Sequence, residues 1–187
     1  MGPGFRRDDS VGWADTRAMI SPLRAGLLAA VITLVADQAS KLWLLDVFDL
    51  AHRVADRGAV RVTPFFDLVL AWNTGISFGW LQGDSAAVQI GLMAIKAVAV
   101  VLLAVWMARS RTLLATIALG MIIGGAIGNA IDRLAYGAVV DFALLHVEIA
   151  GKTFNWYVFN LADVAIVAGV IALLYDSLLG VPAAKAP

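Results

Sequence analysis

The sequence of 187 residues lacks cysteine, has only one glutamate and carries few charged side chains. The missing cysteine excludes disulfides, thiolate metal sites, a cysteine nucleophile and a lipidated cysteine. Charged residues make up 15% of the chain, against about 25% in soluble domains. Hydrophobic residues make up 61%, against about 45–50% in soluble domains. The 14 basic and 14 acidic side chains balance, so no nucleic-acid partner is expected. The composition predicts a membrane protein whose acids are almost all aspartates.

Four apolar windows are long enough to cross a bilayer, which takes about 20 helical residues. They contain only five charged residues, and they cover about 25–45, 86–108, 113–131 and 161–181. We therefore predict a membrane all-α fold, a four-transmembrane-helix bundle that forms a single integral membrane domain over residues 1–187.

The segments between and before these spans are polar. Residues 1–22 mix arginine, aspartate, glycine and proline and are predicted to form a flexible cytoplasmic tail. The outer segments 46–83 and 134–159 each contain two short β-prone runs, which predicts small extracytoplasmic β-hairpin elements. The paired runs are Val60–Thr63 with Leu68–Trp72, and His146–Ile149 with Thr153–Val158.

Arginines next to the short connections indicate the orientation. Arg109 and Arg111 separate the second and third spans, and Arg24 precedes the first. Excess positive charge in short loops marks the cytoplasmic side, which predicts a multi-pass protein with both termini in the cytoplasm. Three further arginines fall on the other side, in the longer segment 46–83, where this rule is weaker.

The unusual polar side chains gather at the outer ends of the predicted spans and in the two outer segments beside them. Ionisable groups inside a membrane usually face a protein interior or a water-filled cavity. Their common placement therefore predicts a site at the outer leaflet. The set comprises Asp37, Lys41, Asn73, Asn129, Asp132, Arg133, Asp141, Asn160 and Asp163.

Each of these groups also has a purely structural interpretation. Asp37 and Lys41 lie four residues apart on one helix face and could form an ion pair. Asn160 and Asp163 have the spacing of a helix N-cap with an acid at the third position. Asp132 could pair with the arginine that follows it.

Glycines recur along the third predicted span and indicate close helix packing. Each of two neighbouring rows of this helix begins with glycine and ends in a polar residue. Packing alone explains the glycines but not the polar ends. The rows are Gly120–Gly124–Gly128–Asp132 and Gly125–Asn129–Arg133.

Five segments in order resemble the successive motifs of the lipoprotein signal peptidase (signal peptidase II) family. The resemblance extends from about residue 25 to 180. The segments are Asp37-Gln-Ala-Ser-Lys41, Asn73-Thr-Gly-Ile-Ser-Phe-Gly79, Gly124-Gly-Ala-Ile-Gly-Asn-Ala-Ile-Asp-Arg133, Val139-Val-Asp-Phe142 and Phe159-Asn-Leu-Ala-Asp163.

The resemblance implies a membrane aspartic endopeptidase that cleaves prolipoproteins before a diacylglyceryl-modified cysteine. Asp141 and Asp163 would be catalytic, and Asp37, Lys41 and Asp132 would be structural. The family implies no metal and no cofactor, and it places the protein in the bacterial cytoplasmic (inner) membrane. The expected partners are prolipoprotein substrates and membrane lipids, and the chain is expected to act as a monomer. Residues matching positions that line the substrate site or support the pair are Asn73, Gly75, Asn129, Arg133 and Asn160.

The residues themselves favour the same chemistry. No His-Glu-x-x-His helix occurs, and Ser77 has no partner histidine in a recognisable motif, whereas two nearby carboxylates can share a proton and activate water. Two other functions remain open at this stage. A small proton- or ion-coupled transporter would use intramembrane carboxylates as a relay, and a non-catalytic scaffold would use the glycine rows for assembly.

Overall fold

The computed structural model describes residues 21–74 and 86–179, and in these residues long helices carry one antiparallel sheet. The helices are α1 (Pro22–Leu42), the π-helical η1 (Trp43–Val47), α2 (Leu50–Arg57), α3 (Ala86–Arg109), α4 (Leu113–Tyr136) and α5 (Leu161–Leu179). The strands are β1 (Val60–Thr63), β2 (Phe66–Asn73), β3 (Val139–Ile149) and β4 (Lys152–Asn155).

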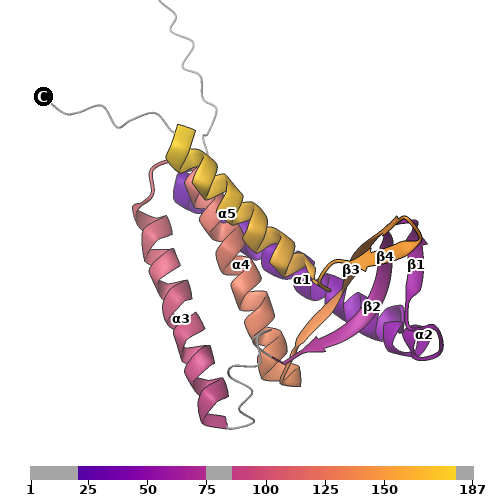
Figure 1. Cartoon of the computed structure of the whole chain (residues 1–187). Coiled ribbons are helices and arrows are strands. Elements are labelled where there is room, and N and C mark those ends of the chain that lie inside the picture. The colour runs from indigo at the N-terminus through magenta and orange to yellow at the C-terminus, as the bar shows by residue number, and fades with distance from the viewer. Residues whose placement is uncertain (1–20, 75–85, 180–187) are drawn as a thin grey trace, which may run out of the picture.

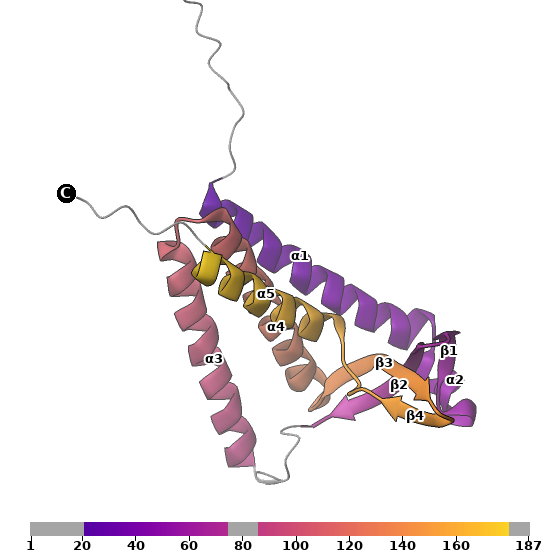
Figure 2. The same ribbon diagram turned by 45° about the horizontal axis from the view of Figure 1, so that its top comes forward.

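Helix α4 lies at the centre of the bundle and packs against α1, α3 and α5. Figure 1 shows the sheet and α2 at one end of the bundle, and the beginning of α1 and the end of α5 at the other. Helix α3 approaches the other helices at that second end and diverges toward the sheet end (Figures 1 and 2). Met107 of α3 packs there on Leu119 and Ile123 of α4 in a buried apolar cluster.

The predicted apolar windows lie in helices as far as the structure describes them, since the last window extends two residues beyond the described residues. In the described residues, three helices are long and apolar enough to cross a membrane, namely Pro22–Val47, Leu113–Tyr136 and Leu161–Leu178. The first begins earlier than predicted, with Pro22 in its opening turn, and continues through the π-helical turn. The window at 86–108 lies in α3. Most of the predicted tail lies outside the described residues.

The all-α assignment was wrong, because the two predicted hairpins join into a four-stranded sheet of order β1-β2-β3-β4. The pairing of β1 with β2 and of β3 with β4 confirms both hairpins. Strand β3, however, begins at Val139 and pairs along its first half with β2. This pairing joins segments about 70 residues apart, which no local pattern reveals. The short helix α2 was also not predicted.

The glycines of α4 allow its neighbours to approach backbone to backbone. A β-carbon at Gly120 would collide with the carbonyl oxygen of Gly26 in α1. One at Gly125 would lie 2.7 Å from the carbonyl oxygen of Ala162 in α5. Two different faces of α4 therefore depend on the absence of a side chain.

A buried ion cluster connects α1 and α4 at the sheet end. The Lys41 Nζ lies 2.8 Å from Asp37 Oδ2 and 2.7 Å from Asp132 Oδ2. All three side chains are at most 2% exposed. The proposed Asp37–Lys41 pair is confirmed, while Asp132 pairs across the helices with Lys41 rather than with its neighbour in sequence.

The same two carboxylates also hold the backbone of other elements. Asp37 Oδ1 accepts a hydrogen bond of 3.0 Å from the backbone N–H of Ala162, in the first turn of α5. Asp132 Oδ2 accepts one of 3.1 Å from the backbone N–H of Val140, at the start of β3. The cluster thus fixes where α5 and β3 begin.

We expect Gly120→Ala to destabilise the protein, because the new methyl group forces α1 away from α4. Overpacking of this kind costs about 1–3 kcal/mol, and thermal unfolding in detergent measures the loss. The control is Gly91→Ala in α3, where an added β-carbon meets nothing within 4 Å. A Tm equal to that of the control would contradict the close approach of α1 and α4.

Asp37→Ala is expected to lower the unfolding temperature strongly. It leaves Lys41 with one carboxylate and the N–H of Ala162 unsatisfied, and breaking a buried ion pair costs about 3–5 kcal/mol. The exposed Asp46, on the same helical run, gives the matched control Asp46→Ala. If both variants unfold at the same temperature, the cluster does not stabilise this fold.

Candidate active site

The start of α5 holds Asp163 in a reciprocal cap. The backbone N–H of Asp163 donates to Asn160 Oδ1 at 3.0 Å, and the backbone N–H of Asn160 donates to Asp163 Oδ2 at 3.2 Å. This is the geometry of a capping box. The structural interpretation of these two residues is therefore correct, and it also fixes the Asp163 carboxylate at the mouth of the helix.

Asp141 lies on β3, shortly after a sharp turn that ends α4. Gly137 adopts a left-handed backbone with φ of 74°, which favours glycine, and the chain turns directly into β3. Ala71 of β2 is the register partner of Asp141. Asn73, two residues further along β2, therefore shares its face of the sheet, and Asn73 Nδ2 donates to Asp141 Oδ2 at 3.0 Å.

An isolated β-bridge brings β3 beside the start of α5. The backbone of Ala143 and that of Phe159 exchange two hydrogen bonds, of 2.8 and 3.0 Å. Phe159 immediately precedes the capping box of α5. The chain between Ala143 and Phe159 returns as the β3–β4 hairpin (Figure 2). Asp141 and Asp163, which are 22 positions apart in the sequence, are thereby brought together.

Two asparagines link the carboxylates. Asn160 Nδ2 donates to Asp141 Oδ1 at 2.7 Å and to Asn129 Oδ1 at 3.0 Å. Asn129 Nδ2 donates to Asp163 Oδ1 at 2.9 Å. An amide side chain both donates and accepts, so these residues orient both carboxylates without adding charge.

The ion cluster lies next to this layer of amides. Lys41 Nζ donates to Asn129 Oδ1 at 3.2 Å, and Arg133 Nη1 donates to the backbone carbonyl of Asn129 at 3.0 Å. Asn129 therefore connects the two carboxylates to the cationic groups of α1 and α4. Arg133 and Asp163 are half-buried, whereas Asp141 is 3% exposed.

Burial raises the pKa of Asp141 above the ordinary value of an aspartate. The negative charge of Asp163 raises this pKa further, while hydrogen bonds from Asn73 and Asn160 oppose the shift. The balance favours a protonated carboxyl on Asp141 at a pH where an exposed aspartate is ionised. A neutral acid and a nearby carboxylate can act together as general acid and general base.

The structure brings nearly all of the candidate residues of the sequence into one connected network. Gly75 lies outside the described residues, so its position is not assigned. The residues in the network are Asp37, Lys41, Asn73, Asn129, Asp132, Arg133, Asp141, Asn160 and Asp163.

Gln38 belongs to the same network and was missed as a site residue. Its Nε2 donates to Asp132 Oδ1 at 2.9 Å and to Asp37 Oδ2 at 3.2 Å. A polar amide between the two charged residues of an otherwise apolar span was the signal that could have identified it.

Comparison with known proteins identifies the family. The family model described as signal peptidase (SPase) II matches residues 29–179. Lipoprotein signal peptidases of Nitrobacter hamburgensis and Rhodopseudomonas palustris are 76% and 71% identical to this chain over 168 residues, which is 90% of the chain and 100% of each relative.

A solved bacterial membrane enzyme has a similar fold, with a TM-score of 0.66 at 26% identity, over 83% of this chain and 93% of that one. The family model extends across the helices and the sheet that carry the two aspartates. The chain belongs to the signal peptidase II family of membrane aspartic peptidases.

Proposed function

We propose that Asp141 and Asp163 are the catalytic pair with which this lipoprotein signal peptidase cuts prolipoproteins before the diacylglyceryl-modified cysteine. The observation that carries the assignment is the shared asparagine. The side chain of Asn160 binds the Asp141 carboxylate while its backbone N–H binds that of Asp163. Two acids from distant parts of the chain are thus held by one residue.

The pair needs one proton between its two carboxylates. The carboxylate that is ionised takes a proton from water, and the resulting hydroxide attacks the carbonyl carbon of the scissile peptide bond. The protonated carboxyl donates a hydrogen bond to the carbonyl oxygen, where negative charge develops. Collapse of the tetrahedral intermediate breaks the C–N bond, and the departing amine takes the proton that the first carboxylate received from water, which returns the pair to one shared proton. Since the two acids titrate together, the roles belong to the pair.

Neighbouring polar groups have supporting roles in this proposal. Asn73, Asn129 and Asn160 keep the two carboxylates in place by hydrogen bonding. The guanidinium of the half-buried Arg133 has five N–H donors, and those not used on Asn129 can bind a backbone carbonyl of the substrate. Asp37, Lys41 and Asp132 hold the elements that carry the pair and do not touch the substrate.

The proposed membrane placement follows from the ends of the helices. Helix α3 would be the fourth span, beside the three long apolar helices. Arg24, Arg109 and Arg111 would lie at the cytoplasmic surface together with both termini. The sheet and the two aspartates would then lie at the outer leaflet, and a single chain, acting as a monomer in one domain, would contain the complete site.

Asp141→Asn and Asp163→Asn are each expected to abolish cleavage, lowering kcat by at least about a thousandfold, because an amide can neither accept the proton of water nor share one. A purified diacylglyceryl-modified prolipoprotein in detergent, followed by its shift in size, measures the loss. The matched control is Glu148→Gln, an exposed acid on the same strand as Asp141. Residual activity above a tenth of wild type in either aspartate variant, with unfolding unchanged, excludes that residue from the pair.

The raised pKa of Asp141 also predicts a pH effect on stability. A group whose pKa is higher in the folded than in the unfolded state binds its proton more tightly when folded. Its contribution to stability is complete below the unfolded pKa of about 3.9 and is lost as the pH rises through the folded value. Asp141→Asn lacks this titration, so its Tm relative to wild type should increase with pH over that interval. A Tm difference that is constant from pH 3.5 to 8 would contradict the raised pKa.

A further inference from the structure

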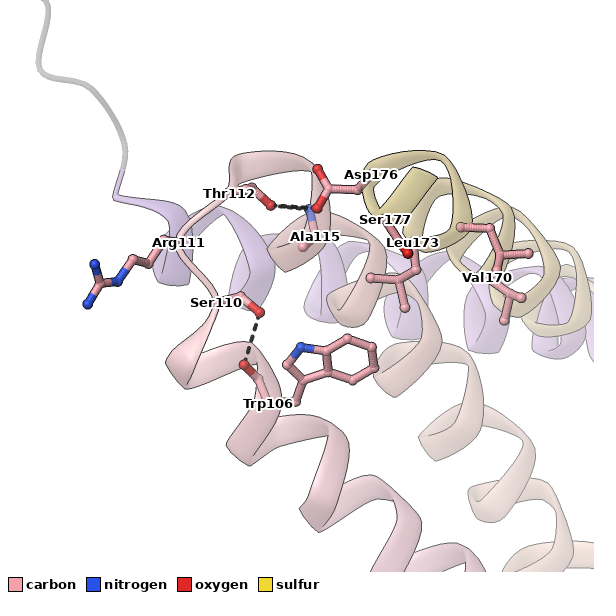
Figure 3. Close-up of a pocket in the computed structure, with 10 residues that line it drawn as sticks. Trp106, Ser110, Arg111, Thr112, Ala115, Val170, Leu173, Asp176 and Ser177 are labelled. Carbon is pink, nitrogen blue, oxygen red and sulfur yellow. Dashed lines mark hydrogen bonds between the residues drawn. The ribbon is translucent and has the colours of Figure 1, made fainter. Parts of the chain in front are cut away.

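A cavity of about 460 Å³ lies at the end of the bundle opposite to the two aspartates. It is formed where α3 ends, α4 begins and α5 ends (Figure 3). Its volume is in the range of roughly 300–1,000 Å³ that is typical of small-molecule sites. None of the residues that line it belongs to the network around Asp141 and Asp163.

The cavity has an apolar interior and a polar rim. Figure 3 shows the Trp106 ring and the side chains of Val170 and Leu173 facing the space between the helices. Thr112 Oγ1 donates to Asp176 Oδ2 at 3.1 Å on the rim. The Arg111 side chain extends from the rim away from the apolar side chains (Figure 3).

This arrangement matches the parts of a membrane phospholipid. Aliphatic and indole side chains can pack along an acyl chain, and tryptophan is common at the level of the lipid headgroups. An arginine on the rim can bind a phosphate through paired N–H donors. Asp176 retains acceptor capacity beyond its bond from Thr112 and can bind a primary ammonium group.

The charges at this end of the bundle favour a phospholipid over a basic peptide segment as the ligand of the cavity. In the described residues, the helix ends at this end of the bundle carry three arginines, Arg24, Arg109 and Arg111, and one acid, Asp176, of which Arg111 and Asp176 line the cavity. A strongly cationic partner would be repelled by this excess, whereas a phosphate is attracted. The single acid adds a preference for a headgroup that carries a positive charge beside its phosphate.

We propose that this cavity binds one phospholipid of the cytoplasmic leaflet, with a preference for an ethanolamine headgroup. Its phosphate contacts Arg111, its ammonium contacts Asp176, and one acyl chain lies between α3 and α5 against Trp106 and Leu173. Because the site is separate from the two aspartates, the proposal does not rest on the catalytic assignment.

The test measures lipid retention by the full-length protein, using native mass spectrometry in detergent. Phosphatidylethanolamine and phosphatidylglycerol with identical acyl chains are offered in equal amounts. We expect one retained lipid per protein and more ethanolamine than glycerol lipid. Asp176→Asn should reduce this preference by about threefold to fivefold, the effect expected from one partly exposed ion pair. Asp141→Asn should retain lipid as the wild type does.

A second pair of variants tests the cavity itself. Leu174→Trp fills the lining and should abolish retention of both lipids, while Leu178→Trp, one turn further along α5 and 78% exposed, should leave it intact. Equal retention by the two tryptophan variants overturns the site. Equal binding of the two lipids, or a preference that Asp176→Asn leaves unchanged, overturns the role of the rim carboxylate. Absence of any retained lipid overturns the proposal as a whole.

Discussion

The buried ammonium group of Lys41 is the constraint on which the arrangement of the other elements depends. A charge removed from water inside a membrane bundle is tolerated only when it is paired and hydrogen-bonded, and here two carboxylates lie within 2.8 Å of it. Each of those carboxylates also accepts a hydrogen bond from a backbone N–H, one in α5 and one in β3. These are the two elements that carry Asp163 and Asp141. The ion cluster therefore sets the relative position of the proposed catalytic pair.

Asparagines separate this cluster from the pair, and their neutrality matters for the chemistry. A cation in direct contact with both carboxylates would stabilise their ionised forms and lower both pKa values. The amides of Asn129 and Asn160 transmit orientation instead, since each binds a carboxylate and the two bind each other. Asp141 accepts two amide hydrogen bonds and still has a raised pKa, because burial outweighs them. The layer of amides thus orients both carboxylates without adding a charge, as the proposed sharing of one proton requires.

The sequence predicted the features that depend on local pattern. Apolar runs identified the four long helices, and paired short β-prone runs identified both hairpins. The pairing of β2 with β3 was not predictable in this way, because Asp67 pairs with Leu144 across a distance in sequence that includes two helices. For the same reason the partner of Asp132 was misjudged, since the neighbouring arginine is visible in the sequence and Lys41 of another helix is not. The motifs contain most of the residues of the network. They do not reveal the hydrogen bonds by which Asn160 connects Asp141 with Asp163.

The glycine rows of α4 relate helix packing to the proposed chemistry, although the two were first considered as competing explanations. A β-carbon at Gly128 would collide with the Asp37 carboxylate, so any larger residue there would displace the acid that holds Lys41 and the first turn of α5. At Gly125 the nearest atom is the carbonyl oxygen of Ala162, in that same turn of α5. Short aspartate side chains can bridge elements only when the backbones are this close. The packing of α4 is therefore a requirement for the network of aspartates and asparagines at its end.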